Sequence, residues 1–373
     1  MLNIKQITLR EILLPLKEPF QISSGTEHNR HIFLVRLKDV DGFVGWGECV
    51  AGKAPNYLPE TIDAAWVMVR EWVAPRILGS ELHGPEEVFK ALEQDFRGHR
   101  MAKAGIEMAA WELAAQIQGI PLARLLGGTR QKVSVGISLG IQEDPEALVT
   151  KVQDCLNQGY KKIKIKITPG KDVAYVKAVR EAVGSNAPIM VDANNAYSLE
   201  DIETLKQLDD FGLIMIEQPL TWDDVVRHAT LQKQMKTPIC LDESITSLEK
   251  AEDMISLGSG RIINIKPGRV GGFTASKAIH DLCEKHEIPV WCGGMLESGV
   301  GRAHNVALAS LPNFTIPGDI SPSSRYWEQD IVTPEWTMED GKITVPLDRP
   351  GMGVSVNLDR VDDLTVRFEN ISF

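Results

Sequence analysis

The sequence predicts an α/β protein in which a parallel (β/α) barrel follows a smaller α+β region. Within residues 133–317, short apolar runs alternate with amphipathic stretches such as 146–159 and 172–184, as in parallel strands joined by helices. Five charged residues end five of these runs at intervals of 26, 25, 25 and 24 residues, which one strand, one helix and two loops would occupy. They are Lys166, Asp192, Glu217, Asp242 and Lys266. These charges should therefore collect at one end of neighbouring strands, where barrel proteins build their active sites.

The N-terminal region follows a different pattern. Three runs with strand-like alternation, at 2–12, 31–40 and 43–50, predict a meander, interrupted by the turn-rich segment 17–29 and by Asp41-Gly42. Helical spacing follows over 59–118, and its clearest apolar stripe has members four, three and four residues apart: Ile106, Ala110, Leu113 and Ile117.

The barrel region offers eight candidate strands. They lie near residues 133–139, 162–167, 188–192, 213–217, 238–242, 261–266, 288–292 and 314–317. An open doubly wound sheet is the alternative, but such sheets usually carry a glycine-rich phosphate turn that segment 136–145 lacks. After the barrel, the strand-like segments 342–347 and 363–373 are expected to return to the first region.

Composition limits the partners and the compartment. A net charge of −11 argues against nucleic acid or an anionic membrane as the main partner. The five cysteines are odd in number and form no CxxC pair, which favours reduced thiols in a cytoplasmic protein over disulfides or a zinc site. The N-terminus lacks the apolar core of a signal peptide, and no apolar run reaches the length of a membrane span.

The run KIKIK places Lys162, Lys164 and Lys166 on one face of a strand. On an edge strand these lysines would lie in water. In a barrel, however, the isoleucines face the helices, and at least Lys164 and Lys166 point inward, where ammonium groups need partners.

Three carboxylates on the next strands provide such partners. Any one of Asp192, Glu217 and Asp242 could be a helix cap or a turn residue. Three acids at the ends of three successive strands would repel one another unless a cation lay between them, and oxygen ligands favour Mg²⁺ or Mn²⁺ over zinc. Asn194 is expected to face the same way.

Lys266 ends the sixth strand, opposite the second, so Lys166 and Lys266 would flank a substrate from two sides. A nearby dication, with Lys164 as a like charge, would depress the pKa of Lys166 and let it act as a base. The predicted chemistry is removal of the α-proton of a carboxylate bound to the metal.

Seven motifs in order resemble the enolase superfamily, muconate-lactonising subgroup, and more closely its N-acylamino acid (N-succinylamino acid) racemase / o-succinylbenzoate synthase family. They are FRGHRMAKAGIEMA (96–109), KIKIKITPG (162–170), VDANNAY (191–197), IEQPL (216–220), TPICLDES (237–244), NIKPGRVGG (264–272) and the segment 289–319.

This resemblance implies roles for the charged residues. Lys166 and Lys266 would be acid/base groups, assisted by Lys164. Asp192, Glu217 and Asp242 would hold the Mg²⁺, with Mn²⁺ as the alternative. In racemisation the two lysines would act on opposite faces of the substrate; in o-succinylbenzoate synthesis, a step towards menaquinone, Lys166 would catalyse a syn dehydration. The expected partner is a small carboxylate, and the expected assembly is a homo-oligomer.

The family fold is a modified (β/α)7β TIM barrel beneath an α+β capping domain. The expected bounds are 1–125 for the capping domain, 126–322 for the barrel and 323–373 for a segment that returns to the cap.

Two specificity loops, 17–27 and 50–58, are expected to contribute Phe20 and Tyr57, for which ordinary loop packing is the alternative. Further candidates for the substrate pocket are Ser138, Asn194, Gly294, Met295, Leu296 and Tyr326. Arg269 would tune Lys266 or cap a helix.

Three alternatives stay open beside this family: a dipeptide epimerase, a muconate-type cycloisomerase and a metal-binding scaffold. A dipeptide epimerase carries Asp-x-Asp after the eighth strand, where this chain has Asp319-Ile320-Ser321. A muconate-type cycloisomerase fits the 96–109 motif less well. A metal-binding scaffold without catalysis would not need both lysines. A histidine base is disfavoured because neither His99 nor His304 ends a predicted strand.

Overall fold

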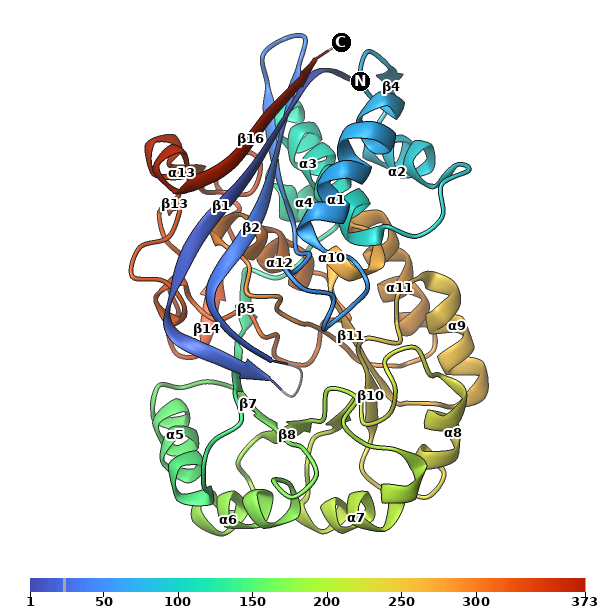
Figure 1. Ribbon diagram of the computed structural model, residues 1–373, viewed down its shortest axis with the longest axis vertical. Coiled ribbons are helices and arrows are strands. Elements are labelled where there is room, and N and C mark those ends of the chain that lie inside the picture. Colours follow the sequence, from blue (N-terminus) through green and yellow to red (C-terminus); the bar gives the residue numbers. More distant parts are fainter. Residues whose placement is uncertain (23–24, 373) are drawn as a thin grey trace.

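The computed structural model describes residues 1–22 and 25–372, and the side chains of residues 20–27 lie outside that description. Figure 1 shows two layers: long N-terminal strands with their helices lie above a barrel whose lower and outer rim is formed by α5 to α9. Both chain ends lie at the top of the upper layer. None of the helices in the described part is long and apolar enough to cross a membrane.

The upper layer, called the capping domain below, is built on an antiparallel sheet of order β16-β1-β2-β3, with β4 paired to β1. Its strands are β1 (Leu2–Ile22), β2 (Gly25–Asp39), β3 (Val44–Cys49), β4 (Glu81–Leu82) and β16 (Thr365–Ser372). The predicted meander is therefore confirmed, but the turn-rich segment is mostly strand. Pairing between β1 and β2 is interrupted between Pro15 and Phe20 and then resumes as far as Ile22. Pro15 and Pro19 cannot donate to a ladder, which accounts for the interruption.

Helices cover one face of this sheet, as the helical spacing predicts. They are α1 (Ile62–Met68), a π-turn (Val69–Val73), a 3₁₀ turn (Ala74–Arg76), α2 (Pro85–Glu93), α3 (Arg100–Gln118) and α4 (Leu122–Leu126). The longest, α3, packs directly on β3. A Cβ at Gly45 would lie 2.2 Å from the Ala109 carbonyl oxygen, and one at Gly47 would lie 2.0 Å from that of Gly105. Glycine on β3 is thus required for this close approach.

The lower layer is a parallel sheet of seven strands in the order β12-β11-β10-β9-β8-β7-β6. The strands are β6 (Gly136–Leu139), β7 (Lys162–Lys166), β8 (Ile189–Asp192), β9 (Ile216–Glu217), β10 (Ile239–Leu241), β11 (Ile262–Ile265) and β12 (Val290–Cys292). The helices around them are α5 (Pro145–Asn157), α6 (Val173–Val183), α7 (Ile202–Gln207), α8 (Val226–Gln232), α9 (Leu248–Leu257), α10 (Pro267–Val270), α11 (Phe273–Lys285) and α12 (Gly299–Ala309). Short 3₁₀ turns at 199–201, 208–211 and 323–325 complete them. The (β/α) barrel prediction is confirmed.

The eighth candidate, 314–317, is not a regular strand. It forms isolated parallel bridges, Val290 to Phe314 on one side and Val135 to Gly318 on the other. The Gly136 amide donates to the Gly318 carbonyl at 2.7 Å, so this segment joins the two ends of the sheet. Pro317 has no N–H to contribute, which explains why the pairing stays irregular.

The C-terminal strands divide between the two layers. They are β13 (Val332–Thr333), β14 (Lys342–Thr344) and β15 (Ser355–Val356), followed by α13 (Leu358–Leu364) and β16. β16 returns to β1, as expected for 363–373. The expectation for 342–347 is wrong, because β14 pairs with β5 (Lys132–Ser134) at the entry to the barrel.

Alternation along the strands divides the barrel interior into two levels. The isoleucines of β7 face outward into the helix-covered core. Within the barrel, five buried side chains from the neighbouring strands form a small cluster of their own: Met190, Met215, Cys240, Ile262 and Trp291. Three of them precede the predicted acids by two residues, so those acids lie on the same face one level closer to the capping domain.

Candidate active site

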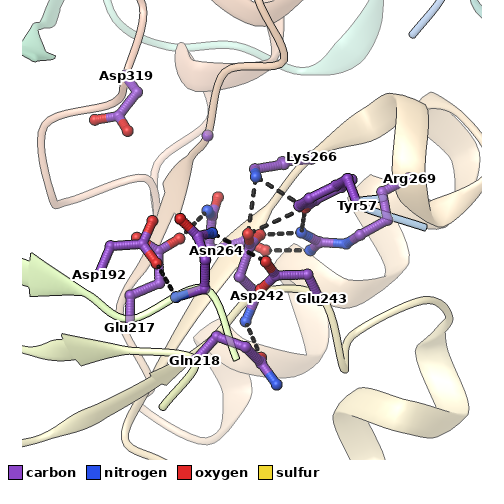
Figure 2. Close-up of polar contacts among 12 residues, drawn as sticks. Tyr57, Asp192, Glu217, Gln218, Asp242, Glu243, Asn264, Lys266, Arg269 and Asp319 are labelled. Carbon is purple, nitrogen blue, oxygen red and sulfur yellow. Dashed lines mark hydrogen bonds and ion pairs between the residues drawn. The ribbon is translucent and has the colours of Figure 1, made fainter. Parts of the chain in front are cut away.

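Three carboxylates form a row at the ends of β8, β9 and β10. In the strand register Lys166 is opposite Asp192, and Asp192 is opposite Glu217, while Asp242 directly follows β10. The three acids are at most 1% exposed. The predicted convergence of these side chains is therefore seen in the structure (Figure 2).

Two lysines from β7 hold one end of this carboxylate row. Lys166 Nζ lies 2.6 Å from Asp192 Oδ2 and 2.5 Å from Asn194 Oδ1. Lys164 Nζ lies 3.0 Å from Glu217 and 3.3 Å from Asp192. A fourth acid, Asp319, lies closer still to Lys164, at 2.7 Å.

Lys266, the residue that follows β11, lies at the opposite end of the carboxylate row. Its Nζ lies 2.8 Å from Asp242 Oδ2 and 2.9 Å from the hydroxyl of Tyr57. Arg269 on α10 donates to the other oxygen of Asp242 and, through Nη2, to the Asn264 carbonyl at 2.5 Å. Figure 2 shows Lys266, Tyr57 and Arg269 converging on Asp242. Arg269 thus touches the same carboxylate as Lys266, which fits the tuning role better than a simple helix cap.

Burial and the neighbouring charges shift the pKa values in opposite directions. Burial, together with the charge of Asp192, raises the pKa of Glu217 to about 7. For Asp242, burial is outweighed by Lys266 and Arg269, which hold its pKa below the ordinary value. Burial opposes the charged form of Lys266, but Asp242 raises its pKa well above the usual range. The pKa of Lys164 is likewise raised, because Asp319 and Glu217 outweigh burial.

The donor set fits a hard divalent cation. Three carboxylates lie in one buried row, and burial, followed by the charge of Asp192, raises the pKa of Glu217. Further buried oxygens nearby have no hydrogen-bond partner among the described residues, namely Glu243 Oε2 and Asn264 Oδ1. An oxygen-only environment of this kind suits Mg²⁺ or Mn²⁺.

A cavity opens above the row, between the capping domain and the barrel loops. Seven predicted pocket residues line it: Tyr57, Ser138, Asn194, Gly294, Met295, Leu296 and Tyr326. Lys164, Lys166 and Lys266 form part of its floor. The side chain of Phe20 lies outside the described residues. Gly293 lies below the cavity, where a Cβ would lie 2.4 Å from Asn264 Oδ1 and 2.6 Å from Lys266 Cε.

Several residues of the site were not predicted as site residues from the sequence. Asp319, Asn264, Glu243 and Arg30 belong to this group. Asn264 Nδ2 donates to Glu217 at 2.8 Å. Asn264 precedes Lys266 by two residues, and strand alternation therefore predicts that both side chains face the same way. This spacing is the sequence feature that could have identified it. Arg30, on β2, offered no signal because its neighbours in the cavity are distant in sequence.

The two histidines are not part of the site. His304 is buried on α12 against Phe273, with ring centroids 5.4 Å apart, and burial lowers its pKa to about 4. Neither it nor His99 lines the cavity. Neither of the two histidines considered from the sequence therefore lies in the cavity.

Fold and site together define a barrel protein whose buried lysines and carboxylates lie at the carboxyl ends of parallel strands under a capping domain. Residues 4–127 match the mandelate racemase / muconate lactonizing enzyme N-terminal domain, and residues 147–360 match the enolase C-terminal domain-like family. The chain therefore belongs to the enolase superfamily, whose members generally use Mg²⁺.

Similar proteins span nearly the whole chain. An o-succinylbenzoate synthase of Bacillus subtilis is 50% identical over 96% of both chains. An N-succinylamino acid racemase of Thermus thermophilus is 48% identical over 98% of both. A crystal structure of an enolase-superfamily member from Listeria innocua superimposes with a TM-score of 0.96 at 40% identity, covering 100% of both chains.

Proposed function

We propose that this enzyme removes the α-proton of an N-succinylamino acid and returns a proton to the opposite face, and that the same site can catalyse o-succinylbenzoate synthesis. The observation that carries the proposal is the placement of two lysines at opposite ends of one carboxylate row. Lys166 contacts Asp192 at 2.6 Å, and Lys266 contacts Asp242 at 2.8 Å. Relatives at 48–50% identity bear both activity names, which supports a site shared by the two reactions.

The two lysines would divide the proton transfers. A substrate whose α-carbon lies between them presents one face to each Nζ, so that one lysine takes the proton while the other donates. Asp242 holds Lys266 in its protonated form, ready to donate or to stabilise developing negative charge. In a dehydration, the same cation would stabilise the anion while Lys166 handles the proton.

Asp192, Glu217 and Asp242 would hold the Mg²⁺. When bound, the ion would polarise the substrate carboxylate and so make the neighbouring C–H bond more acidic. Lys164, fixed between Glu217 and Asp319, would orient the carboxylate end of the substrate. Asn194 donates to Glu243 at 3.1 Å and accepts from Lys166, which fixes the position of that lysine.

The location proposed for the protein is the cytoplasm. All five cysteines are buried and unpaired, in keeping with a reducing compartment.

Incubation with N-succinyl-L-phenylalanine in D₂O with Mg²⁺ tests the proposal. We expect α-deuteration together with loss of optical rotation, and EDTA should abolish both. The immediate precursor of o-succinylbenzoate, supplied separately, should be dehydrated. If neither substrate reacts, the assignment is wrong, and activity that survives EDTA would remove the metal from the proposal.

A further inference from the structure

Among the described residues, one cationic side chain of the cavity has no anionic partner. Arg30, on β2 of the capping sheet, is only 6% exposed and lines the same cavity as the barrel lysines. Its Nη2 donates to the Val50 carbonyl at 2.8 Å. Its Nε is buried without a hydrogen-bond partner, and no carboxylate among the described residues forms an ion pair with it.

The other cations of the cavity are all paired. Lys164 contacts Asp319 and Glu217, Lys166 contacts Asp192, and Lys266 contacts Asp242. They belong to the barrel, whereas Arg30 comes from the cap. The lysines in the floor of the cavity are therefore neutralised by carboxylates, whereas Arg30 in its wall has no such partner among the described residues.

A glutamate in the lining of the same cavity is already bonded elsewhere. Glu60 lines the cavity but accepts hydrogen bonds from the amides of Met101 and Ala102, at 2.9 and 3.1 Å, at the start of α3. An arginine is costly to bury without a counter-ion, since a charged group loses its hydration. Its planar, forked donors match a carboxylate in geometry.

From this arrangement we propose that Arg30 binds the second anionic group of the substrate, the terminal carboxylate of its acyl chain. This inference rests on the proposed function, because it assumes that the α-carboxylate lies at the barrel floor. A dianionic substrate would then reach between the two layers, with one carboxylate at the metal ligands and the other at Arg30. Specificity for succinyl over neutral acyl groups would come from this contact.

The rival role for Arg30 is to hold the 50–58 loop through Val50. A matched substrate pair separates the two roles: N-succinyl-L-phenylalanine and its isostere in which the terminal carboxylate is a primary amide. For the wild-type enzyme we expect the amide to have a KM about tenfold or more above that of the acid, as for loss of a charge-assisted hydrogen bond. In Arg30→Gln this preference should vanish, because KM rises for the acid and stays nearly level for the amide.

Control variants make the result specific. Arg36→Gln changes another arginine on β2, which contacts Trp46 and does not line the cavity, and it should keep the wild-type preference. Arg30→Lys should retain part of it. Thermal unfolding of each variant checks that the fold is intact.

Each result decides the proposal. Equal KM values for acid and amide in the wild type would overturn it, even if Arg30→Gln proved too unstable to assay. Equal loss on both substrates in Arg30→Gln would assign the residue to the loop and also overturn it. Absence of proton exchange by the wild type on either substrate would instead refute the proposed function.

Discussion

The hydroxyl of Tyr57, in the capping domain, lies 2.9 Å from Nζ of Lys266 at the end of a barrel strand. The same oxygen lies 3.1 Å from Asp242 and 3.4 Å from Arg269. One phenol therefore joins the two layers at the group proposed to donate a proton. Docking of the capping domain on the barrel thus places this hydroxyl beside both Lys266 and Asp242.

Tyr57→Phe should lower kcat for N-succinyl-L-phenylalanine by about tenfold or more, because a hydrogen bond between charged and polar groups is lost at Lys266. The melting temperature should change little. Tyr175→Phe is the control, since it removes a hydroxyl that donates to the Glu143 carbonyl away from the cavity. Unchanged kcat in Tyr57→Phe, or the same loss in the control, would disprove this coupling.

Glu217→Gln should weaken Mn²⁺ binding by about 100-fold or more, as expected on removing one charged ligand from a three-carboxylate site. Titration calorimetry without substrate gives this affinity independently of turnover. Glu112→Gln is a matched control, because Glu112 is also buried, with a pKa that burial raises to about 7, but it lies on α3 outside the cavity. Equal Mn²⁺ affinities in the two variants would exclude Glu217 as a ligand.

His228 should make the fold sensitive to acid. Its Nε2 accepts from the Leu220 amide at 3.1 Å and its Nδ1 lies against the Asp224 carbonyl, an arrangement that requires the neutral ring. Burial lowers its pKa to about 4, below the ordinary 6.5. Between these values the unfolded chain binds a proton that the folded chain does not, so the free energy of unfolding falls as the pH falls.

The full effect of His228 is roughly 3 kcal/mol, present above pH 6.5 and lost by about pH 4. His304, with a pKa also lowered to about 4, adds to it. Urea unfolding at pH 7 and pH 4.5 measures the loss. In His228→Gln the difference between the two pH values should shrink, and a difference as large as in the wild type would refute the assignment.

Glu107 ties the capping domain to the barrel. From α3 it accepts the amides of Phe273 and Thr274, at 2.7 and 2.9 Å, at the start of α11, and the indole N–H of Trp111 at 2.8 Å. Glu107→Gln turns an amide N–H₂ towards donors and should lower the free energy of unfolding by about 2 kcal/mol or more.

Chemical unfolding at pH 7.5 provides the test of Glu107. Glu181→Gln, on the exposed face of α6, should stay within about 0.5 kcal/mol of the wild type. A similarly small change in Glu107→Gln would show that the contact does not hold the two layers together.

Sequence periodicity predicted the barrel and its charged row, because strand alternation and a repeat of about 25 residues determine which side chains meet. Asp192, Glu217 and Asp242 could be placed for this reason. The same reasoning does not apply to segments that lie outside this repeat. The segment after Phe314 bridges both neighbours without forming a strand, so the inward position of Asp319 depended on backbone geometry that the pattern does not encode.

The capping residues were harder to place. Tyr57 was predicted only as a pocket contact, and its bonds to Lys266 and Asp242 arise from the docking of one layer on the other. In the sequence, Arg30 immediately precedes the predicted strand 31–40 and has no feature that distinguishes it from a surface residue. Its guanidinium donates to Val50 at the start of the 50–58 loop, a tertiary contact that the local sequence pattern does not specify.

The most direct test of the two-lysine arrangement is α-proton exchange in D₂O, measured by NMR on each pure enantiomer of N-succinylphenylalanine. Lys166→Ala and Lys266→Ala should each lose racemisation, and each should retain exchange of only one enantiomer, opposite for the two variants. Wild-type racemisation in either variant, or exchange of the same enantiomer by both, would contradict an active site with acid–base groups on two faces.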